Sequence, residues 1–229
     1  MKEIDNNEWA NPTPAGLVSF AVACFGFFAT LTGKVEASAS VLLGIWLLGG
    51  FIIQIIVALL DLKSGNIAGG NTFLFFSGFF MFVGGTGMIT KFFFAMKGIP
   101  IDTRIDGWAW IVLTVVLILW TPSFFKGPLT LAIIIIITNL ALPFITLIDL
   151  KILPHDFAFI PGYILLIAGI IAIYLSTALV INGTYGRTIL PITREVKENR
   201  RIDDIRTEDR RTDNSEIEDD DFLEYVNFE

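Results

Sequence analysis

Uncharged polar side chains interrupt the apolar stretches of this chain, and they are the residues that could bind a small solute. The amides and hydroxyls that stand out are Gln54, Asn71, Thr72, Thr138 and Asn139. Such groups can replace water around a small anion without the deep binding well that a lysine would create. Hydrogen bonding between neighbouring membrane helices is the common alternative. The pattern therefore leaves two interpretations open, a row of solute-binding groups or interhelical hydrogen bonds.

Residue types that carry catalysis or bind metals are scarce. The chain has one cysteine, Cys24, and one histidine, His155, which excludes an internal disulfide, a cysteine zinc cluster and a multi-histidine metal site. No nucleophile–base pair lies in an apolar stretch. His155 stands beside Asp156 in a polar link, where a solvated histidine is more common than a catalytic one. We therefore expect no metal and no cofactor, and we do not expect an enzyme.

The segment NPTPAGL at 11–17 has the composition of a helix N-terminus. Asn11 is a candidate N-cap, and Pro12 and Pro14 suit the first turn. A helix N-terminus presents free N–H groups and a partial positive charge, so it can attract an anion. A plain helix start explains the same residues, and both interpretations stay open at this point.

Long apolar stretches surround these residues in the sequence. The chain has 229 residues, of which 54% are hydrophobic and only 17% are charged. A globular protein of this size cannot bury so much apolar surface, which points to a lipid bilayer. The uncharged stretches are 9–33, 37–60, 64–90, 107–125, 127–148 and 157–186. Each is close to or above the length of about 20 residues that a spanning helix needs. Because the stretches are continuously apolar rather than alternating, we predict an all-α, six-transmembrane-helix bundle and not a barrel.

The links between these stretches are short, and only the link 91–106 has modest length. Neighbouring spans must then run antiparallel, so six spans put both termini on one side. Lysine and arginine residues near the spans favour the cytoplasm for that side, and the basic cluster after the last span decides it. We predict a multi-pass protein of the plasma membrane with both termini cytoplasmic. The absence of charged residues in the middle of the stretches argues against an ion pump with a carboxylate relay and against a voltage sensor.

The chain divides into three regions. Residues 1–10 form a polar N-terminus, residues 11–192 a six-helix transmembrane domain, and residues 193–229 an acidic, disordered cytoplasmic tail. Six of the seven net negative charges lie in residues 187–229. A short docking segment is the alternative for the acidic and aromatic end of this tail.

Three segments resemble those of one membrane protein family. NPTPAGL at 11–17 resembles the NPAPLGL signature of the acetate uptake transporter family, the succinate–acetate permeases. LDLKSGN at 60–66 is similar to the family's LEYKKGN. AIYL at 172–175, followed by YGRTILPI at 185–192, is similar to its closing AIYL and FGRTVLPI. The matches occur in the family's order and span about residues 9–194, so the tail lies outside the resemblance.

The resemblance implies six transmembrane helices, a homohexamer, and a pore with an apolar, aromatic constriction within each protomer. It implies passage of acetate and similar small carboxylates, either channel-like or together with protons. Phe20 matches the aromatic residue that follows the signature, and Phe76 falls at the family's third-span tyrosine. Ile137 or Thr138 falls at the fifth-span position. A second Gly-Asn, at 70–71, would instead move the third-span position to Met81.

We therefore predict a monocarboxylate transporter. The start of the first span attracts the anion, amides and hydroxyls bind it transiently, and the aromatic constriction closes a dry passage. A bare carboxylate faces a large desolvation cost there, so passage as the protonated acid or with a proton is expected at low external pH. A membrane sensor or scaffold that signals through the acidic tail is the alternative. The candidate substrate-binding and pore residues are Asn11, Pro12, Pro14, Phe20, Gln54, Asn71, Thr72, Phe76, Ile137, Thr138 and Asn139.

Overall fold

The computed structural model describes residues 10–193, so the expectations for the acidic tail and for residues 1–9 lie outside the described residues. The described part is helical and contains no strand. Its elements are α1 (Thr13–Leu31), α2 (Ala39–Lys63), α3 (Ile67–Phe75), the π-helical segment η1 (Phe76–Val83), α4 (Gly84–Met96), α5 (Arg104–Trp120), the 3-10 segment η2 (Thr121–Lys126), α6 (Leu129–Asp149), the 3-10 segment η3 (His155–Ala158) and α7 (Phe159–Tyr185).

Six helices in the described part are long and apolar enough to cross a membrane. They are α1, α2, the continuous helix α3–η1–α4, α5 with η2, α6, and η3 with α7. The prediction of an all-α protein with six membrane-spanning helices is therefore confirmed. The protein is a multi-pass membrane protein.

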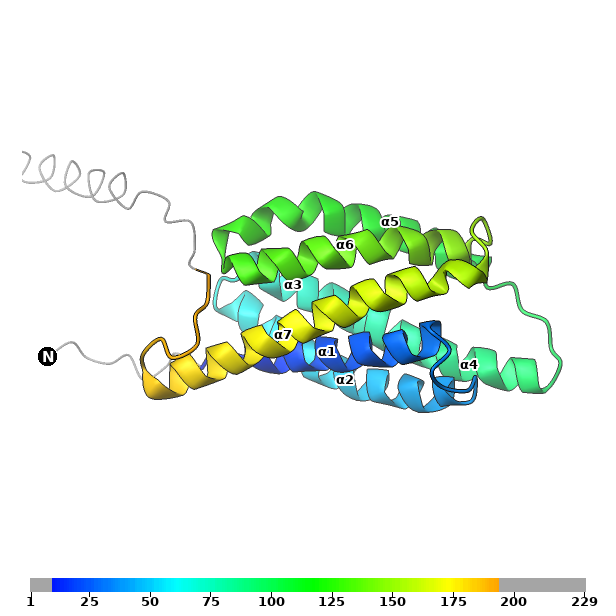
Figure 1. Cartoon of the computed structure of the whole chain (residues 1–229), viewed down its shortest axis with the longest axis horizontal. Coiled ribbons are helices and arrows are strands. Elements are labelled where there is room, and N and C mark those ends of the chain that lie inside the picture. The colour runs from blue at the N-terminus through cyan, green and yellow to red at the C-terminus, as the bar shows by residue number, and fades with distance from the viewer. Residues whose placement is uncertain (1–9, 194–229) are drawn as a thin grey trace, which may run out of the picture.

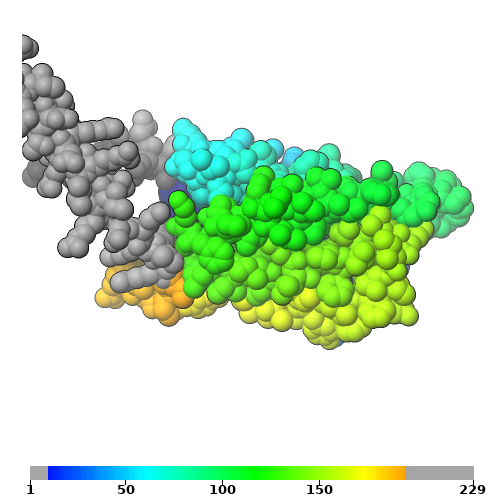
Figure 2. All heavy atoms as spheres, turned by 90° about the horizontal axis from the view of Figure 1, so that it is seen from above, coloured from blue at the N-terminus to red at the C-terminus, as the bar shows by residue number. Residues whose placement is uncertain are grey.

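The helices form an elongated antiparallel bundle (Figure 1). α1 packs most extensively against α7 and also against α2, while α6 packs against both α5 and α7. Seen from the other direction, α5 and α6 lie between α3 and α7 on one face of the molecule (Figure 2). The described chain begins and ends at the same end of the bundle, which we call the terminal end.

Several helices continue through charged residues beyond the ends of the uncharged stretches, so the boundaries predicted from those stretches were wrong. The third span runs to Met96 instead of ending near residue 90, and the link to α5 shrinks to residues 97–103. Lys91 on α4 and Asp106 on α5 form an ion pair, which neutralises both charges at the end of the bundle away from the termini. In the remaining link, the hydrogen bonds from Arg104 hold the pKa of the Asp102 carboxyl well below its usual range.

Two glycines allow α2 and α4 to approach each other at backbone distance. A Cβ atom at Gly44 would lie 2.7 Å from the carbonyl oxygen of Gly85, and a Cβ at Gly85 would lie 2.7 Å from that of Gly44. Small residues at such crossings are typical of membrane helices, because packing rather than the hydrophobic effect drives their association.

A Gly44→Ala substitution is expected to destabilise the bundle by about 1–3 kcal/mol, because the new methyl group must push two backbones apart. The midpoint of thermal unfolding in detergent measures the loss. Gly49→Ala on the same helix is the control, since nothing lies within 4 Å of a Cβ at that position. Equal midpoints for the two variants would contradict the close packing of α2 and α4.

Candidate functional site

A cavity of about 1360 Å³ opens at the terminal end of the bundle. Its wall is built from three segments that are far apart in the sequence: the start of α1, the turn between α2 and α3, and the link between η2 and α6. The side chains of Lys63 and Lys126 line it together with Asn11 and Asn66, while Phe73 and Leu175 contribute apolar surface. The wall of the cavity thus combines polar and charged residues with a larger share of apolar surface, part of which α3 and α7 contribute.

A buried carboxylate organises the wall of the cavity. Asp61, near the end of α2, is only 2% exposed, and its Oδ2 accepts a hydrogen bond of 3.1 Å from Asn66 Nδ2. Asn66 Oδ1 in turn accepts from the backbone N–H of Gly69 at 3.0 Å and so caps the start of α3. A Cβ at Gly69 would lie 2.8 Å from Asp61 Oδ2, so only glycine fits here without rearrangement. The carboxylate therefore holds the turn between α2 and α3 in shape.

The start of α1 lies on the wall of the same cavity. Asn11 and Pro12 both line it. The cap differs from the prediction, because Pro12 is the N-cap and α1 begins at Thr13. Asn11 lies one residue earlier and accepts a hydrogen bond of 3.0 Å from the backbone N–H of Thr13 through Oδ1. Pro14 does not line the cavity, and its carbonyl oxygen accepts from Ser176 Oγ on α7 at 2.9 Å.

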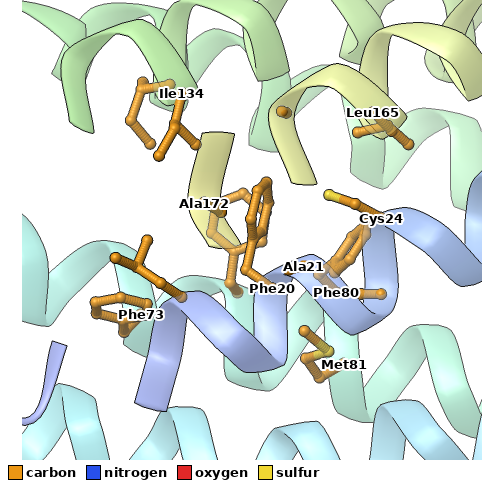
Figure 3. Packing of buried hydrophobic residues seen from close by; sticks show 14 of the residues in the cluster. Phe20, Ala21, Cys24, Phe73, Phe80, Met81, Ile134, Leu165 and Ala172 are labelled. Atoms are coloured by element: carbon orange, nitrogen blue, oxygen red, sulfur yellow. The ribbon is translucent and has the colours of Figure 1, made fainter. Parts of the chain in front are cut away.

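Phe20 and Phe76 meet in the interior of the bundle. Their ring centroids are 5.8 Å apart in an edge-to-face arrangement, and the side chains are 6% and 4% exposed. Phe76 also contacts Phe80 at 5.5 Å and Phe75 at 5.1 Å. Figure 3 shows Phe20 extending from α1 among Phe73, Ile134 and Ala172. Side chains of several helical segments thus converge on Phe20 and Phe76, which we call the aromatic pair.

The two candidate positions on the third span have different neighbours. Phe76 lies against Phe20, whereas the sulfur of Met81 lies near α2, 3.1 Å from a Cβ placed at Gly50. On α6, Thr138 is 1% exposed and shares the inward face with Ile134, whereas Ile137 is only partly buried against the core. The hydroxyl of Thr138 donates to the Ile134 carbonyl at 2.8 Å. The Thr138 hydroxyl proton is thus used in a hydrogen bond within its own helix.

Three of the candidate residues leave a buried polar atom without a partner. They are Gln54 at Oε1, Thr72 at Oγ1 and Asn139 at Oδ1. Buried polar groups are nearly always hydrogen-bonded, so each of these atoms requires an explanation. Asn71 differs, because it lines the cavity and donates to the Ile67 carbonyl at 2.9 Å. Gln54, Thr72 and Asn139 therefore each keep a polar atom that a solute could bind. Thr138 fits the other interpretation better, because its hydroxyl is hydrogen-bonded within α6.

The backbone carbonyl of Asn139 lacks the usual helical donor four residues later. Pro143 lies inside α6 four residues later, and a proline has no N–H to donate to the carbonyl of the residue four before it. The side chain of Asn139 donates to Thr121 Oγ1 at 2.6 Å, which ties α6 to η2 and leaves Oδ1 unpaired. The spacing Asn-x-x-x-Pro is visible in the sequence and could have marked this position.

The closing motif of the resemblance folds back on α7. Asn182 Oδ1 accepts from the backbone N–H groups of Ile189 and Leu190 at 2.8 and 2.9 Å, and the hydroxyl of Tyr174 donates to the Pro191 carbonyl at 2.6 Å. The segment reaches α6, where the hydroxyls of Thr130 and Thr193 lie 2.7 Å apart. These hydrogen bonds therefore hold the closing motif against the end of α7 and against α6, beside the cavity.

A solved structure matches this arrangement over nearly the whole of its own chain. It is described as the structure of the bacterial acetate channel SatP, and the likeness has a TM-score of 0.64 at 24% sequence identity, covering 80% of this chain and 99% of that one. This chain has a fold similar to that of SatP. The six-helix fold that the resemblance to the acetate uptake transporter family implies is thus the fold of this chain. No protein-family model and no curated protein matches the sequence.

The similarity to SatP covers the six-helix bundle, and within that bundle the sequence motifs missed several site residues. Asp61, Lys63 and Lys126 were assigned to links, because charged residues mark the ends of apolar stretches. The structure places all three on the wall of the cavity. The signal was available for Asp61, since it lies within a segment that resembles the family and just before a Gly-Asn turn.

Proposed function

We propose that this protein transports acetate and similar small carboxylates across a membrane, channel-like or coupled to protons, through a pore that the aromatic pair gates in each protomer. The observation that carries the proposal is the cavity at the terminal end, whose wall includes the start of α1, a helix N-terminus suited to a small anion. The likeness to a structure described as an acetate channel supports the same substrate class.

The geometry suggests an order of events. The free N–H groups at the start of α1 raise the local concentration of carboxylate in the cavity. The apolar wall formed by Phe73 and Leu175 leads toward the aromatic pair, whose rings exclude water while they remain in contact. Gln54, Thr72 and Asn139 supply hydrogen-bonding capacity along the interior. Passage then requires the two rings to separate by a change of side-chain rotamers, which is fast compared with a rearrangement of helices.

Uptake of labelled acetate into proteoliposomes tests the proposal. At acidic external pH, vesicles that contain the protein should accumulate label faster than protein-free vesicles of the same lipid. Excess unlabelled acetate should reduce that uptake, and an excess of a large aromatic acid should not. Equal uptake with and without protein at every pH would rule out the proposed transport.

We further propose a homohexamer in the plasma membrane with the terminal end in the cytoplasm. The proposal is supported by the family resemblance and by the basic residues at this end of the bundle, among them Lys63 and Lys126. Native mass measurement of the purified protein tests the assembly, and labelling of single cysteines placed in the 97–103 link in intact cells tests the orientation.

A further inference from the structure

The inner end of the cavity is closed by apolar side chains from three helices. Phe73 on α3, Leu131 on α6 and Leu175 on α7 all line the cavity. Counted from the terminal end, each is the lining residue that lies farthest along its helix. Phe73 is 8% exposed and Leu175 is 1% exposed, while Leu131 is partly buried against the core. We call these three residues the cavity floor.

The ring of Phe73 closes the floor against α1, because Gly16 on that helix has no side chain. A Cβ atom at Gly16 would lie 2.5 Å from Cε1 and 2.7 Å from Cζ of the ring, closer than two such carbon atoms can approach. The ring therefore lies directly on the backbone of α1. Thr13, about one turn earlier on α1, still lines the cavity. The ring of Phe73 thus stands between the cavity and the interior of the bundle.

The aromatic pair lies about one helical turn deeper than the floor. Phe20 follows Gly16 by four residues and Phe76 follows Phe73 by three, on helices that both run away from the terminal end (Figure 1). Figure 3 likewise shows Phe73 beside the first turns of α1 and Phe20 farther along that helix. One turn of helix rises about 5.4 Å. A solute that moves inward from the cavity therefore meets two apolar layers in series.

The spacing of the two layers affects short and long acids differently. A two-carbon acid can lie between the layers, so it needs to open only one of them at a time. An acid with several more methylene groups reaches from one layer into the next and must hold both open at once. The free-energy costs of the two openings then add within a single barrier, and the rate falls exponentially with the height of that barrier.

We propose that Phe73 is a specificity-determining residue, whose ring forms a second constriction at the cavity floor and, together with the aromatic pair, limits the length of the carboxylic acid that passes. The cavity beside the ring gives it space in which to turn, so the floor opens by a change of side-chain rotamer. This inference rests on the proposed transport function.

The test compares the native chain with Phe73→Ala. Fluxes of labelled acetate and labelled hexanoate are measured in the same proteoliposomes at neutral pH, each corrected for protein-free vesicles. The hexanoate-to-acetate ratio is the readout, because it does not depend on how much folded protein each preparation contains. Phe51→Ala is the control, since Phe51 is a partly buried phenylalanine on α2 that contacts the exposed ring of Phe82 and does not line the cavity.

We expect Phe73→Ala to raise hexanoate flux about tenfold, which is the low end of the discrimination that one methylene group produces in a fitted pocket. Acetate flux should rise by only about twofold, because removing one of two comparable barriers that are crossed in turn halves the total resistance. Phe51→Ala should keep the native ratio.

An equal increase for both acids in Phe73→Ala, or a native hexanoate-to-acetate ratio in that variant, would overturn the inference and leave acetate transport intact. Absence of acetate flux in the native chain would overturn the transport function and this inference together.

A second variant covers the case in which Phe73→Ala does not yield a monodisperse protein. Phe73→Leu keeps an apolar side chain at the floor and removes the ring that lies on Gly16. The hexanoate-to-acetate ratio should rise several-fold, by less than in Phe73→Ala. A native ratio in Phe73→Leu would contradict a constriction formed by the ring.

Discussion

Phe76→Ala should conduct carboxylic acids larger than acetate at least about tenfold faster than the native chain. Each aromatic contact is worth about 0.5–1.5 kcal/mol beyond its buried area, and the substitution removes the contacts of Phe76 with Phe20, Phe75 and Phe80. A barrier lowered by about 1.4 kcal/mol is a tenfold increase in rate. Labelled lactate and benzoate uptake, each relative to acetate, measures the loss of selectivity.

Phe79→Ala is the matched control for Phe76→Ala. Phe79 belongs to the same π-helical segment but is 57% exposed on the outside of the bundle. Phe76→Ala should also cost about 3–5 kcal/mol of stability, as the loss of a buried aromatic side chain does, whereas Phe79→Ala should change the unfolding midpoint little. If both variants show native selectivity, Phe76 does not form the constriction.

Asp61→Ala should destabilise the turn between α2 and α3 and the cavity wall that this turn forms. The substitution leaves the amide of Asn66 without the buried carboxylate that accepts its hydrogen bond. An unsatisfied buried group costs about 1–3 kcal/mol, and hydrogen bonds to charged groups lie at the upper end of that range. We expect a lower midpoint of thermal unfolding and faster hydrogen exchange at the first backbone amides of α3, starting at Gly69.

Asp61→Asn separates the shape of this side chain from its charge. The amide oxygen can still accept from Asn66, so the loss of stability should be smaller than in Asp61→Ala. The cavity loses one negative charge from the wall that also holds Lys63, so acetate binding in the cavity should strengthen at low ionic strength and return toward the native value at high salt, where charges are screened. Equal stability losses in the two variants would show that the hydrogen bond to Asn66 is not what holds the turn.

Much of the fold could be predicted because membrane spans are encoded locally. A stretch of about 20 apolar residues must satisfy its backbone hydrogen bonds internally, and short links leave only antiparallel neighbours. The six spans could be derived from this rule and are confirmed. Their ends could not, because Lys91 and Asp106 neutralise each other on adjacent helices, and an ion pair between distant residues is invisible in either stretch alone.

The site could be predicted only in part. Phe20 and Phe76 were chosen as one pair by their places in two motifs, and the structure brings their rings into contact. The direction of each side chain on the third span depends on the π-helical segment Phe76–Val83, whose wider turns rotate the side chains relative to a regular α-helix. A hydropathy pattern carries no signal for that rotation.

The amino-acid pattern was enough to predict six membrane-spanning helices and the three motifs that accompany them. What the motifs build depends on helix packing, because the cavity wall joins residues near positions 12, 64 and 127 that no local pattern relates. Helix packing also sets which buried polar atoms have a hydrogen-bond partner. The hydroxyl of Thr138 donates within its own helix. The Gln54 amide instead donates to the carbonyl of Gly16 on a neighbouring helix, and its oxygen is left without a partner. The position of that carbonyl cannot be derived from the residues around Gln54.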